Sequence, residues 1–443
     1  MNAFPLPFPW RFEVAAFIVA AAAAPFTVLA SDPSLDEIVG DERFWQLDAN
    51  LFMERYEPIG FEWTSAAKKS ARLSGLREGV SLHGEEVGET IVTFVEGRPK
   101  QVQVSIHNRG DDGEITEEQF EALLEAWKNH VTEISGARAA DRGRDNQSAV
   151  RADGWIWKTG SVAYLLEHSS QREIRTRDIP FRSEFIRLRV APYVEKSFME
   201  EKLSGPEERV TKDDLPANVV RENGDTYIKG IPMVDQGQKG YCVVATASRV
   251  FKYYDIAVDQ HEMAQIANSS AEGGTTSVGM IEALEDISGR FKVRVKTHDA
   301  MEYDDVIDLV DDYNRYASRA DKPELPVSPS INMWYHFDLF DPEVLKATRL
   351  RSSAGIKRFK SEIERAIDEG IPLLWTVTVG IFEEPKRISQ TRGGHMRMII
   401  GYNWDEDEVI FTDSWGAGHE FKRWGVEEAY CSTKGIYSIQ PTM

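Results

Sequence analysis

The sequence contains very little cysteine, with only Cys242 and Cys431 among its 443 residues. Two thiols in so long a chain exclude a disulfide framework, and they exclude the clustered cysteine and histidine ligands of a structural zinc site. One disulfide between the two residues is compatible with this content, and so is one reactive thiol. We interpret Cys431 as a structural residue.

The sequence also has few positive charges for its size. Its 52 lysines and arginines stand against 73 aspartates and glutamates, which gives a net charge of −21, and no basic block interrupts this acidity. Because such a surface repels phosphates, we expect no nucleic-acid partner. The 42% hydrophobic and 28% charged content is typical of a globular protein, and the length allows two or three domains.

Long hydrophobic runs are absent except near the amino terminus. Residues 17–30 are apolar and uncharged, but this run is shorter than the ~20 residues that a membrane-spanning helix needs. Arg11 before the run, and the small residue Ala30 at its end, are typical of a secretory signal. We therefore expect a signal peptide over residues 1–30, cleaved near Ala30, and an extracytoplasmic protein, periplasmic or secreted, without a stable membrane span. An uncleaved anchor and a mis-set start codon are the alternatives.

Residues 31–200 have the pattern of a separate α+β domain. Alternating apolar and polar residues predict strands, and apolar residues at helical spacing predict a helix. In chain order we expect a β-hairpin, a helix and two further strands, at 89–106, 117–134, 155–166 and 174–190. Residues 201–227 are polar and contain glycine and prolines, so we interpret them as a linker.

The loop 108–119 resembles an EF-hand calcium loop, in which Gly113 would occupy the turn position. However, Gly110 and Gln119 stand where oxygen ligands are needed. The simpler interpretation is a hairpin exit followed by a helix that Thr116 caps. We favour that interpretation and expect no metal here.

The carboxy-terminal half changes from helical patterns to strands, which predicts an α+β fold with helices layered on a sheet. The helix expected over 303–317 carries five aspartates, which we interpret as a solvated face rather than a cation site. One helix is expected to begin at Cys242, and two others to cover 259–268 and 277–287. A further helix is expected to include 361–364 and to end at Gly370. The strands are expected at 373–379, 396–402, 409–412 and 435–439.

Residues for nucleophilic catalysis occur at the ends of these elements. Cys242 stands at the amino end of its helix, where unpaired N–H groups and the helix dipole stabilise a thiolate. His395 begins one strand and Asp413 ends the next, so the carboxylate is placed to orient the imidazole beside the thiol. Gln236 is the candidate donor to the oxyanion, and Trp415 is placed to shield the His–Asp pair from water.

These segments resemble those of papain-like cysteine peptidases, and most closely the branch that includes the bacteriocin-leader, or double-glycine, peptidases. The resemblance rests on residues 236–242 (QGQKGYC), on 394–395 (GH) and on 413–416 (DSWG), and it covers about 228–443. It implies a helical layer packed on an antiparallel sheet, with Cys242, His395, Asp413 and Gln236 as site residues. The residue after the nucleophile differs from the family pattern, because it is Val243 rather than Trp or Gly.

Several residues are alternatives to this assignment. Gln238 is a second candidate for the oxyanion donor, and a disulfide between Cys242 and Cys431 would remove the nucleophile. Other histidines could serve as the base, although ordinary surface roles account for most of them. These histidines are His261, His298, His336 and His419.

The leading hypothesis is an exported papain-like cysteine peptidase that acts on peptides or proteins and needs no metal or organic cofactor. A transglutaminase-like thiol acyltransferase could use the same residues, and a catalytically silent peptide-binding module is the non-enzymatic alternative. For residues 31–200 we favour an accessory domain over an inhibitory pro-domain, because the segment has enough elements for its own core. A fragment that begins near Asn223 would then retain its activity on small peptides.

Overall fold

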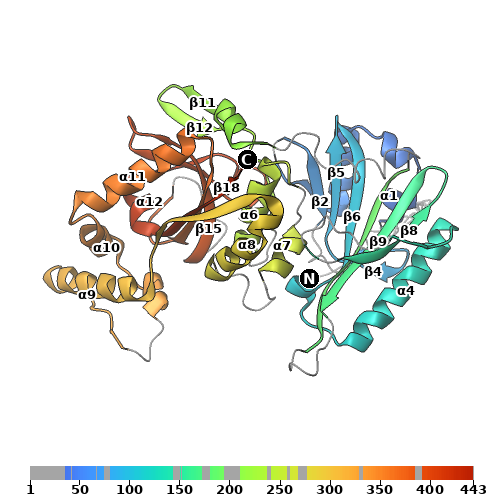
Figure 1. Ribbon diagram of the computed structural model, residues 1–443, viewed down its shortest axis with the longest axis horizontal. Helices are drawn as coiled ribbons and strands as arrows, with labels where there is room; N and C mark the ends of the chain where they lie inside the picture. Colours follow the sequence, from blue (N-terminus) through green and yellow to red (C-terminus); the bar gives the residue numbers. More distant parts are fainter. Residues whose placement is uncertain are drawn as a thin grey trace, which may run out of the picture.

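The computed structural model describes residues 35–40, 42–65, 67–73, 80–142, 150, 152–171, 180–193, 210–236, 241–256, 260–267, 277–328, 333–384 and 392–442. The expected signal peptide, residues 1–30, lies outside these ranges. Among the described helices, none combines the length and the apolar character that crossing a membrane requires. Two antiparallel sheets, one in each half of the chain, flank a central group of helices (Figure 1).

The amino-terminal half is built on an eight-stranded antiparallel sheet in the order β1-β2-β5-β6-β10-β9-β8-β7. A core of apolar side chains lies between this sheet and its helices, with Phe52, Phe61 and Trp157 fully buried in it. The strands are β1 (Phe61–Trp63), β2 (Ser70–Leu73), β5 (Thr90–Val95), β6 (Arg98–Asn108), β7 (Ala140–Asp141), β8 (Asp153–Lys158), β9 (Val162–Gln171) and β10 (Arg182–Pro192), with β3 (Ser81–Leu82) and β4 (Glu85–Glu86) forming a small separate pair. The helices are α1 (Asp36–Gly40), η1 (Glu42–Gln46), α2 (Ala49–Tyr56), η2 (Glu57–Ile59), α3 (Arg109–Asp112) and α4 (Glu117–Ser135).

The expected hairpin and helix of this half are both present. Strands β5 and β6 pair across the turn at Gly97, and α4 begins at a capping box in which Thr116 and Gln119 exchange hydrogen bonds. The short helix α3 occupies the start of the EF-hand-like loop, with the Asn108 side chain accepting from the Gly110 N–H. The single strand expected over 155–166 is wrong, because a turn at Gly160 divides it into β8 and β9.

The carboxy-terminal half contains a second antiparallel sheet in the order β11-β12-β15-β14-β18-β13, and β16 joins β15 to β17. Helix α6 packs against β15, with Val244, Ala247 and Val250 fully buried. The strands are β11 (Val219–Glu222), β12 (Asp225–Ile228), β13 (Val293–Ala300), β14 (Leu373–Val379), β15 (Gly393–Asn403), β16 (Glu408–Thr412), β17 (Lys422–Gly425) and β18 (Thr433–Pro441). The helices are η4 (Lys212–Asn218), α6 (Cys242–Tyr253), α7 (Gln260–Ile266), α8 (Ser277–Phe291), α9 (Tyr303–Arg319), η5 (Met333–Asp338), α10 (Pro342–Arg349), α11 (Ser353–Asp368) and α12 (Val426–Ser432).

The chain order of the elements in this half differs from the expected one, in which all helices precede the strands. Strand β13 enters the sheet from before α9 and pairs with β18. Helix α8 continues through Gly289 to Phe291, because the Phe291 ring packs edge-on against Phe251 of α6, 5.3 Å between centroids. The α+β class, with helices packed on an antiparallel sheet, is confirmed.

The segment 210–228 belongs to the carboxy-terminal fold rather than to a linker. Its helix η4 buries Leu215 completely in the core of that half, and β12 pairs with the central strand β15. Gly401 permits this pairing, because an added Cβ there would lie 2.5 Å from the Thr226 carbonyl oxygen. The expected linker over 201–227 is therefore wrong for the residues from 210 onward, and 201–209 lie outside the described residues.

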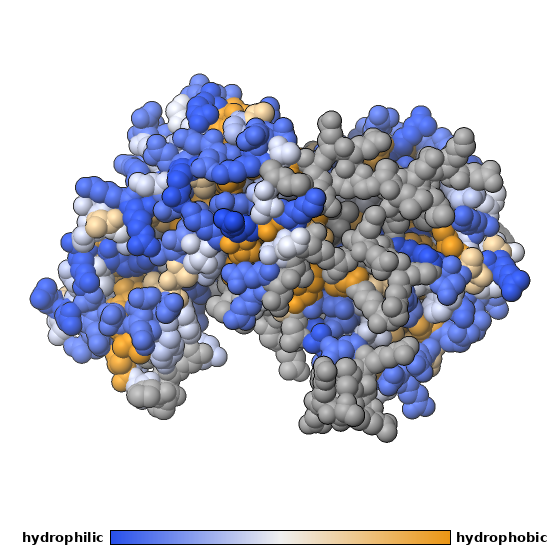
Figure 2. All heavy atoms as spheres, viewed as in Figure 1, coloured by the Kyte–Doolittle hydropathy of each residue, from blue (hydrophilic) through white to orange (hydrophobic). Residues whose placement is uncertain are grey.

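The two halves contact each other through buried side chains. Arg187 of β10 pairs with Glu262 of α7 at 3.0 Å, and Ile266 packs against a small apolar cluster of the amino-terminal half that includes Phe185. Figure 1 shows α6, α7 and α8 between the two sheets. On the face drawn in Figure 2, the described surface is mainly hydrophilic in both halves, with small and separate hydrophobic patches.

Candidate active site

Cys242 is the first residue of α6, as expected, and its side chain is only partly accessible. The helix forms because ten of its twelve residues are buried against β15 and the neighbouring helices. Its N-cap residue, Tyr241, makes no side-chain capping hydrogen bond, and the Val243 backbone interacts instead with the thiol. The amino end of the helix therefore faces the sulfur and favours its anionic form.

His395 and Asp413 come together from neighbouring strands. His395 lies in β15 and Asp413 follows β16 directly, and these two strands pair antiparallel. His395 Nε2 lies 3.1 Å from Asp413 Oδ1, and both side chains are fully buried. This hydrogen bond fixes the ring and leaves Nδ1 as the nitrogen that can exchange a proton with a thiol.

The thiol and the imidazole shift each other's pKa toward the ion pair. Burial alone would raise the pKa of Cys242, but a hydrogen bond with His395 and the imidazolium charge bring this pKa below its ordinary value. Burial would likewise lower the pKa of His395, but the hydrogen bonds with Asp413 and Cys242 raise it above its ordinary value. Both shifts favour the thiolate–imidazolium pair over the neutral pair.

Trp415 covers the His395 ring, as the sequence predicts. The two rings stack with centroids 4.3 Å apart and planes inclined by 15°. His395 is buried with its hydrogen-bond partner beneath this indole. The indole keeps water from the His–Asp hydrogen bond, which strengthens that bond by lowering the local dielectric.

Asp413 also contacts two buried cations that the sequence reasoning missed. Arg397 Nε lies 2.9 Å from Oδ1, and Lys422 Nζ donates to Oδ2 at 2.7 Å. Arg397 additionally donates to both carboxylate oxygens of Glu384 at 2.9 Å, so the cluster is nearly neutral. Although burial would raise the pKa of Asp413, the Arg397 charge and the His395 hydrogen bond hold it far below its ordinary value. Arg397 follows His395 by two residues on a buried strand, and that position is a signal that could have been recognised.

Gln236 is joined to the residue after Asp413. Its backbone N–H donates to the Ser414 carbonyl oxygen at 2.8 Å, and the Ser414 hydroxyl donates to its side-chain oxygen at 2.6 Å. Because the carbonyl end of the amide is held by Ser414, the orientation of the amide N–H group is fixed as well. Gln236 and Ser414 are both buried.

Arg249 ties the helix of Cys242 to the segments that carry the other site residues. Its guanidinium donates to the Asp413 carbonyl oxygen at 3.0 Å, to Thr412 Oγ1 at 2.8 Å and to the Pro232 carbonyl oxygen at 2.7 Å. Burial lowers the pKa of Arg249 to about 10. The sequence offers one signal for this role, a charged residue within an apolar helix pattern.

Lys434 of β18 is a further cation near the thiol that the sequence reasoning missed. Its charge interacts with Cys242 and Asp338, while burial lowers the pKa of the ammonium group. The ammonium also lies 5.4 Å from the centre of the Phe337 ring. A cation here adds to the stabilisation of the thiolate.

The alternative histidines take other partners. His298 lies 2.8 Å from both Glu362 and Ser438, and His336 lies 2.6 Å from the Pro326 carbonyl oxygen. The His419 ring contacts Trp415 edge-on at 5.5 Å, and its carbonyl oxygen accepts from the Asp413 N–H. The side chain of His261 and the whole of Gln238 lie outside the described residues.

Cys431 is a free thiol, and so is Cys242, which leaves both without a disulfide. Cys431 is completely buried in α12, and its burial raises the pKa of the thiol to about 12. The two cysteines therefore have opposite pKa shifts, and Cys431 lacks thiolate character at neutral pH.

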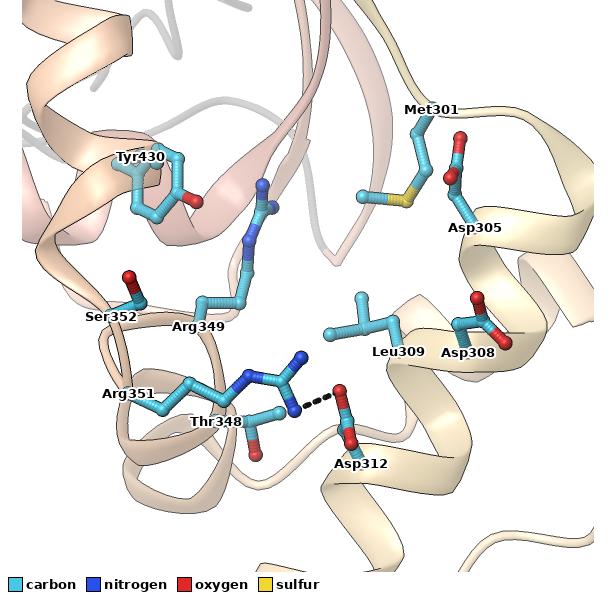
Figure 3. A pocket seen from close by; sticks show the side chains of 11 residues that line it. Met301, Asp305, Asp308, Leu309, Asp312, Thr348, Arg349, Arg351, Ser352 and Tyr430 are labelled. Carbon is cyan, nitrogen blue, oxygen red and sulfur yellow. Dashed lines mark ion pairs between the residues drawn. The ribbon is translucent and has the colours of Figure 1, made fainter.

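A pocket of about 320 Å³ lies between α9 and the α10–α11 region, and Cys242, His395 and Asp413 are not among the residues that line it (Figure 3). Asp305 and Asp308 of α9 line one side, and Arg349 and Arg351 line the other. Arg351 pairs with Asp312 across it. The aspartates of α9 other than Asp312 are exposed, as expected for a solvated face. Among the described residues, no group of three or more His, Cys, Asp or Glu side chains could hold a metal ion.

Comparison with known proteins gives one family match and several similar solved structures. Residues 228–436 match the model of the Peptidase_C39 like family. Among solved structures, the chain is similar to the peptidase domain of Streptococcus ComA, a bi-functional ABC transporter involved in a quorum sensing pathway, at 12% identity over 48% of this chain and 99% of that one, with a TM-score of 0.24. It is also similar to xylellain, a cysteine protease from Xylella fastidiosa, at 11% identity over 53% of this chain and 91% of that one, with a TM-score of 0.27. No curated protein matches the chain.

The sequence match, rather than the structural likeness, defines the class. A helical layer on an antiparallel sheet, matched over residues 228–436 to this family, supports a papain-like cysteine peptidase of the C39 type in the carboxy-terminal half. The chain is therefore a cysteine peptidase, a hydrolase that acts on peptides or proteins.

Proposed function

We propose that this protein is an exported peptidase that cleaves peptide bonds through a triad of Cys242, His395 and Asp413, with Gln236 as the oxyanion donor. The observation that supports the proposal is a thiol whose pKa the neighbouring imidazole lowers, together with a buried carboxylate 3.1 Å from that imidazole. The interaction of Cys242 with His395 lowers the thiol pKa against the effect of burial, and Asp413 binds Nε2 of the same ring. Such an arrangement is what an activated cysteine nucleophile requires.

In the proposed reaction, the Cys242 thiolate attacks the carbonyl carbon of the scissile bond, and the carbonyl oxygen becomes an oxyanion. The Gln236 amide and the Cys242 N–H donate to this oxygen. The His395 imidazolium then gives its proton to the leaving amine, and the C–N bond breaks to leave a thioester. A water molecule, deprotonated by His395, attacks the thioester and releases the acid, which restores the thiolate and the imidazolium.

Asp413 and its cations have a defined part in this sequence. The carboxylate stabilises the imidazolium, while Arg397 and Lys422 keep the carboxylate ionised in its buried position. The carboxylate therefore stays charged while the proton resides on the ring. The proposed steps require no metal and no organic cofactor.

The export part of the proposal rests on the apolar run at 17–30 and on the polar residues after it. An extracytoplasmic location implies that the substrates are peptides or proteins of the cell envelope or the surroundings. The net charge of −21 disfavours nucleic acid as a partner.

The test is a comparison of two single substitutions in the chain from residue 31 onward. Wild type, Cys242→Ser and Cys431→Ser are incubated with a library of mixed-sequence peptides, and products are identified by mass spectrometry. We expect cleavage by wild type and by Cys431→Ser, and none by Cys242→Ser. Cleavage that survives in Cys242→Ser would overturn the proposal. Products joined to an added amine, rather than hydrolysed, would favour the acyltransferase instead.

A further inference from the structure

The amino-terminal half reaches the residue next to Gln236. Arg72 of β2 lies 3.0 Å from the Asp235 carboxylate, and the same guanidinium donates to the Asp235 carbonyl oxygen at 3.4 Å. The two side chains are largely buried, each with 14% of its surface exposed. Glu89, in the same half, lies 3.7 Å from Arg72 and orients it.

These contacts hold one peptide group from two sides. The carbonyl oxygen of the Asp235–Gln236 peptide accepts from Arg72, in the amino-terminal half. The N–H of the same peptide donates to the Ser414 carbonyl oxygen, in the peptidase half. Because this peptide precedes the Gln236 side chain directly, its orientation sets the direction in which the amide points.

A second contact reaches the residue before Cys242. Tyr241 is almost completely buried, with 1% of its surface exposed, and its hydroxyl lies against Gly110 of α3. A Cβ added at Gly110 would overlap this hydroxyl. The phenol also interacts with Asn108 and Asp111, both in the amino-terminal half. Tyr241 is the N-cap of α6, so its position fixes the start of the helix that presents the thiol.

The two halves are also joined away from the site. The Arg187–Glu262 pair is buried, with 3% and 7% of the side chains exposed, and Arg187 is itself held by Glu167 at 3.0 Å. Two buried charges that satisfy each other across an interface make separation of the halves costly. The contacts at Asp235 and Tyr241 are therefore parts of a fixed interface.

We infer that the amino-terminal half is a positioning element of the active site, in which Arg72 sets the oxyanion donor Gln236 and Gly110 accommodates Tyr241 at the start of the nucleophile helix. This inference rests on the proposed function of Cys242 and Gln236. It replaces both earlier interpretations of this half, since a detachable accessory domain would be dispensable and an inhibitory pro-domain would lower activity. Arg72 and Gly110 act through other residues and are positioning residues.

The two contacts predict different kinetic signatures. Alkylation of Cys242 by iodoacetamide depends on the thiolate and develops no oxyanion, so it does not sense Gln236. In the full chain, Arg72→Met should lower kcat at least about tenfold on the peptide that wild type cleaves fastest, because it misplaces an oxyanion donor. The rate of Cys242 alkylation should remain within twofold of wild type. Arg72→Lys, which keeps the charge toward Asp235, should recover part of the lost kcat.

The matched control for this variant is Arg189→Met. Arg189 is similarly buried, with 20% of its side chain exposed, and it pairs with Glu167 inside the amino-terminal sheet. The Arg189→Met variant should lose as much thermal stability as Arg72→Met does, but its kcat at 25 °C should equal that of wild type. Equal kcat values for the two variants would overturn the role of Arg72.

Gly110→Ala tests the second contact, with Gly160→Ala as its control. An added Cβ meets no atom within 4 Å at Gly160, so that variant should behave as wild type. Gly110→Ala should displace Tyr241 and slow both peptide cleavage and Cys242 alkylation at least about fivefold. Cys431, which is completely buried, serves as an unreactive internal standard in the mass spectrum. An unchanged rate of Cys242 alkylation in folded Gly110→Ala would overturn the inference, whether or not wild type cleaves a peptide. If wild type cleaves no peptide but the alkylation rates differ as expected, only the proposed function is contradicted.

Discussion

Asp413 in the peptidase half and Glu167 in the amino-terminal half are both buried carboxylates surrounded by cations. Asp413 contacts Arg397 at 2.9 Å and Lys422 at 2.7 Å. Glu167 contacts Arg187 at 3.0 Å and also pairs with two further arginines. Burial would raise the pKa of each carboxyl, but the neighbouring cations lower both, to about 2 for Glu167.

The difference lies in what else each carboxylate touches. Asp413 accepts from His395, whose ring also interacts with the Cys242 thiol. Glu167 contacts arginines, which stay protonated throughout the physiological pH range. A lowered carboxylate pKa therefore marks a buried ion cluster in both places, and only the imidazole and thiol give one cluster a proton to transfer.

The largest effect that would sharpen this comparison is expected from Asp413→Asn. A neutral amide leaves Arg397 and Lys422 with Glu384 as their remaining carboxylate, and their charges then disfavour an imidazolium at His395. We expect kcat to fall by about 10²–10⁴-fold, as for loss of general acid–base catalysis. The free energy of unfolding should fall by about 3–5 kcal/mol, as for a broken buried pair. Peptide cleavage and urea unfolding measure the two effects, and an active, fully stable variant would contradict the role of this cluster.

Glu167→Gln should match the loss of stability without the loss of catalysis. Removing the carboxylate takes away a shared charged partner of three largely buried arginines, so we expect a cost of about 3–5 kcal/mol in unfolding free energy. Because Glu167 makes no contact with the triad, kcat per folded molecule should stay within about twofold of wild type. Single-turnover cleavage of a peptide at 20 °C would measure this rate. A loss of kcat as large as that of Asp413→Asn would remove the distinction between the two clusters.

The same variant should change the response of stability to acid. The pKa of Glu167 is lowered from 4.5 to about 2, so its contribution to stability is present above about pH 4.5 and is lost as the pH falls toward 2. Glu167→Gln has no carboxylate to protonate at this position, so its unfolding free energy should decline less steeply than that of wild type between pH 4.5 and 2. Urea unfolding at a series of pH values checks this, and parallel curves would mean that Glu167 is not ionised in the folded protein.

The smallest effect is expected from Trp415→Phe. The indole stacks on His395, and a pair of this kind contributes about 0.5–1.5 kcal/mol, so a smaller ring should lower kcat by about 2–10-fold. Trp404 is a matched control, because it stacks on Tyr402 with the same inclination of 15° at 4.7 Å, away from the site. Trp404→Phe should leave kcat unchanged. Equal losses in the two variants would show that the stacking at His395 has no particular part in catalysis.

Much of the fold follows from local patterns in the sequence. The hairpin of β5 and β6, the helix α4 and the strands β14 to β16 have clear alternation or helical spacing, and each occurs close to its expected position. The hairpin of β11 and β12 was missed although its signal was present. Asn223 and Gly224 both have positive φ, 53° and 83°, which is the signature of a two-residue hairpin turn. The polar composition around it concealed that signal.

The residues of the site also fall into two groups, those that local sequence patterns predict and those that they do not. Cys242, His395 and Asp413 are recognisable because each stands at the end of a helix or strand, and the structure places them together. The partners of Asp413 are harder to predict, since Lys422 reaches it from β17 and no local pattern indicates that contact. The contacts of Arg72 and Gly110 join residues more than 100 positions apart, and only the packing of the two halves brings them together.

The most direct test of the Cys242–His395 pair is the pH dependence of iodoacetamide alkylation at Cys242, in wild type and in His395→Ala. In wild type the thiol pKa lies below its ordinary value of 9.0 because the imidazole outweighs burial. Without the imidazole, burial dominates and should raise this pKa above 9.0. We therefore predict rapid alkylation of wild type near neutral pH and, for His395→Ala, a midpoint moved to higher pH together with complete loss of peptide cleavage. Identical pH profiles for the two proteins would contradict the ion pair on which the proposed mechanism depends.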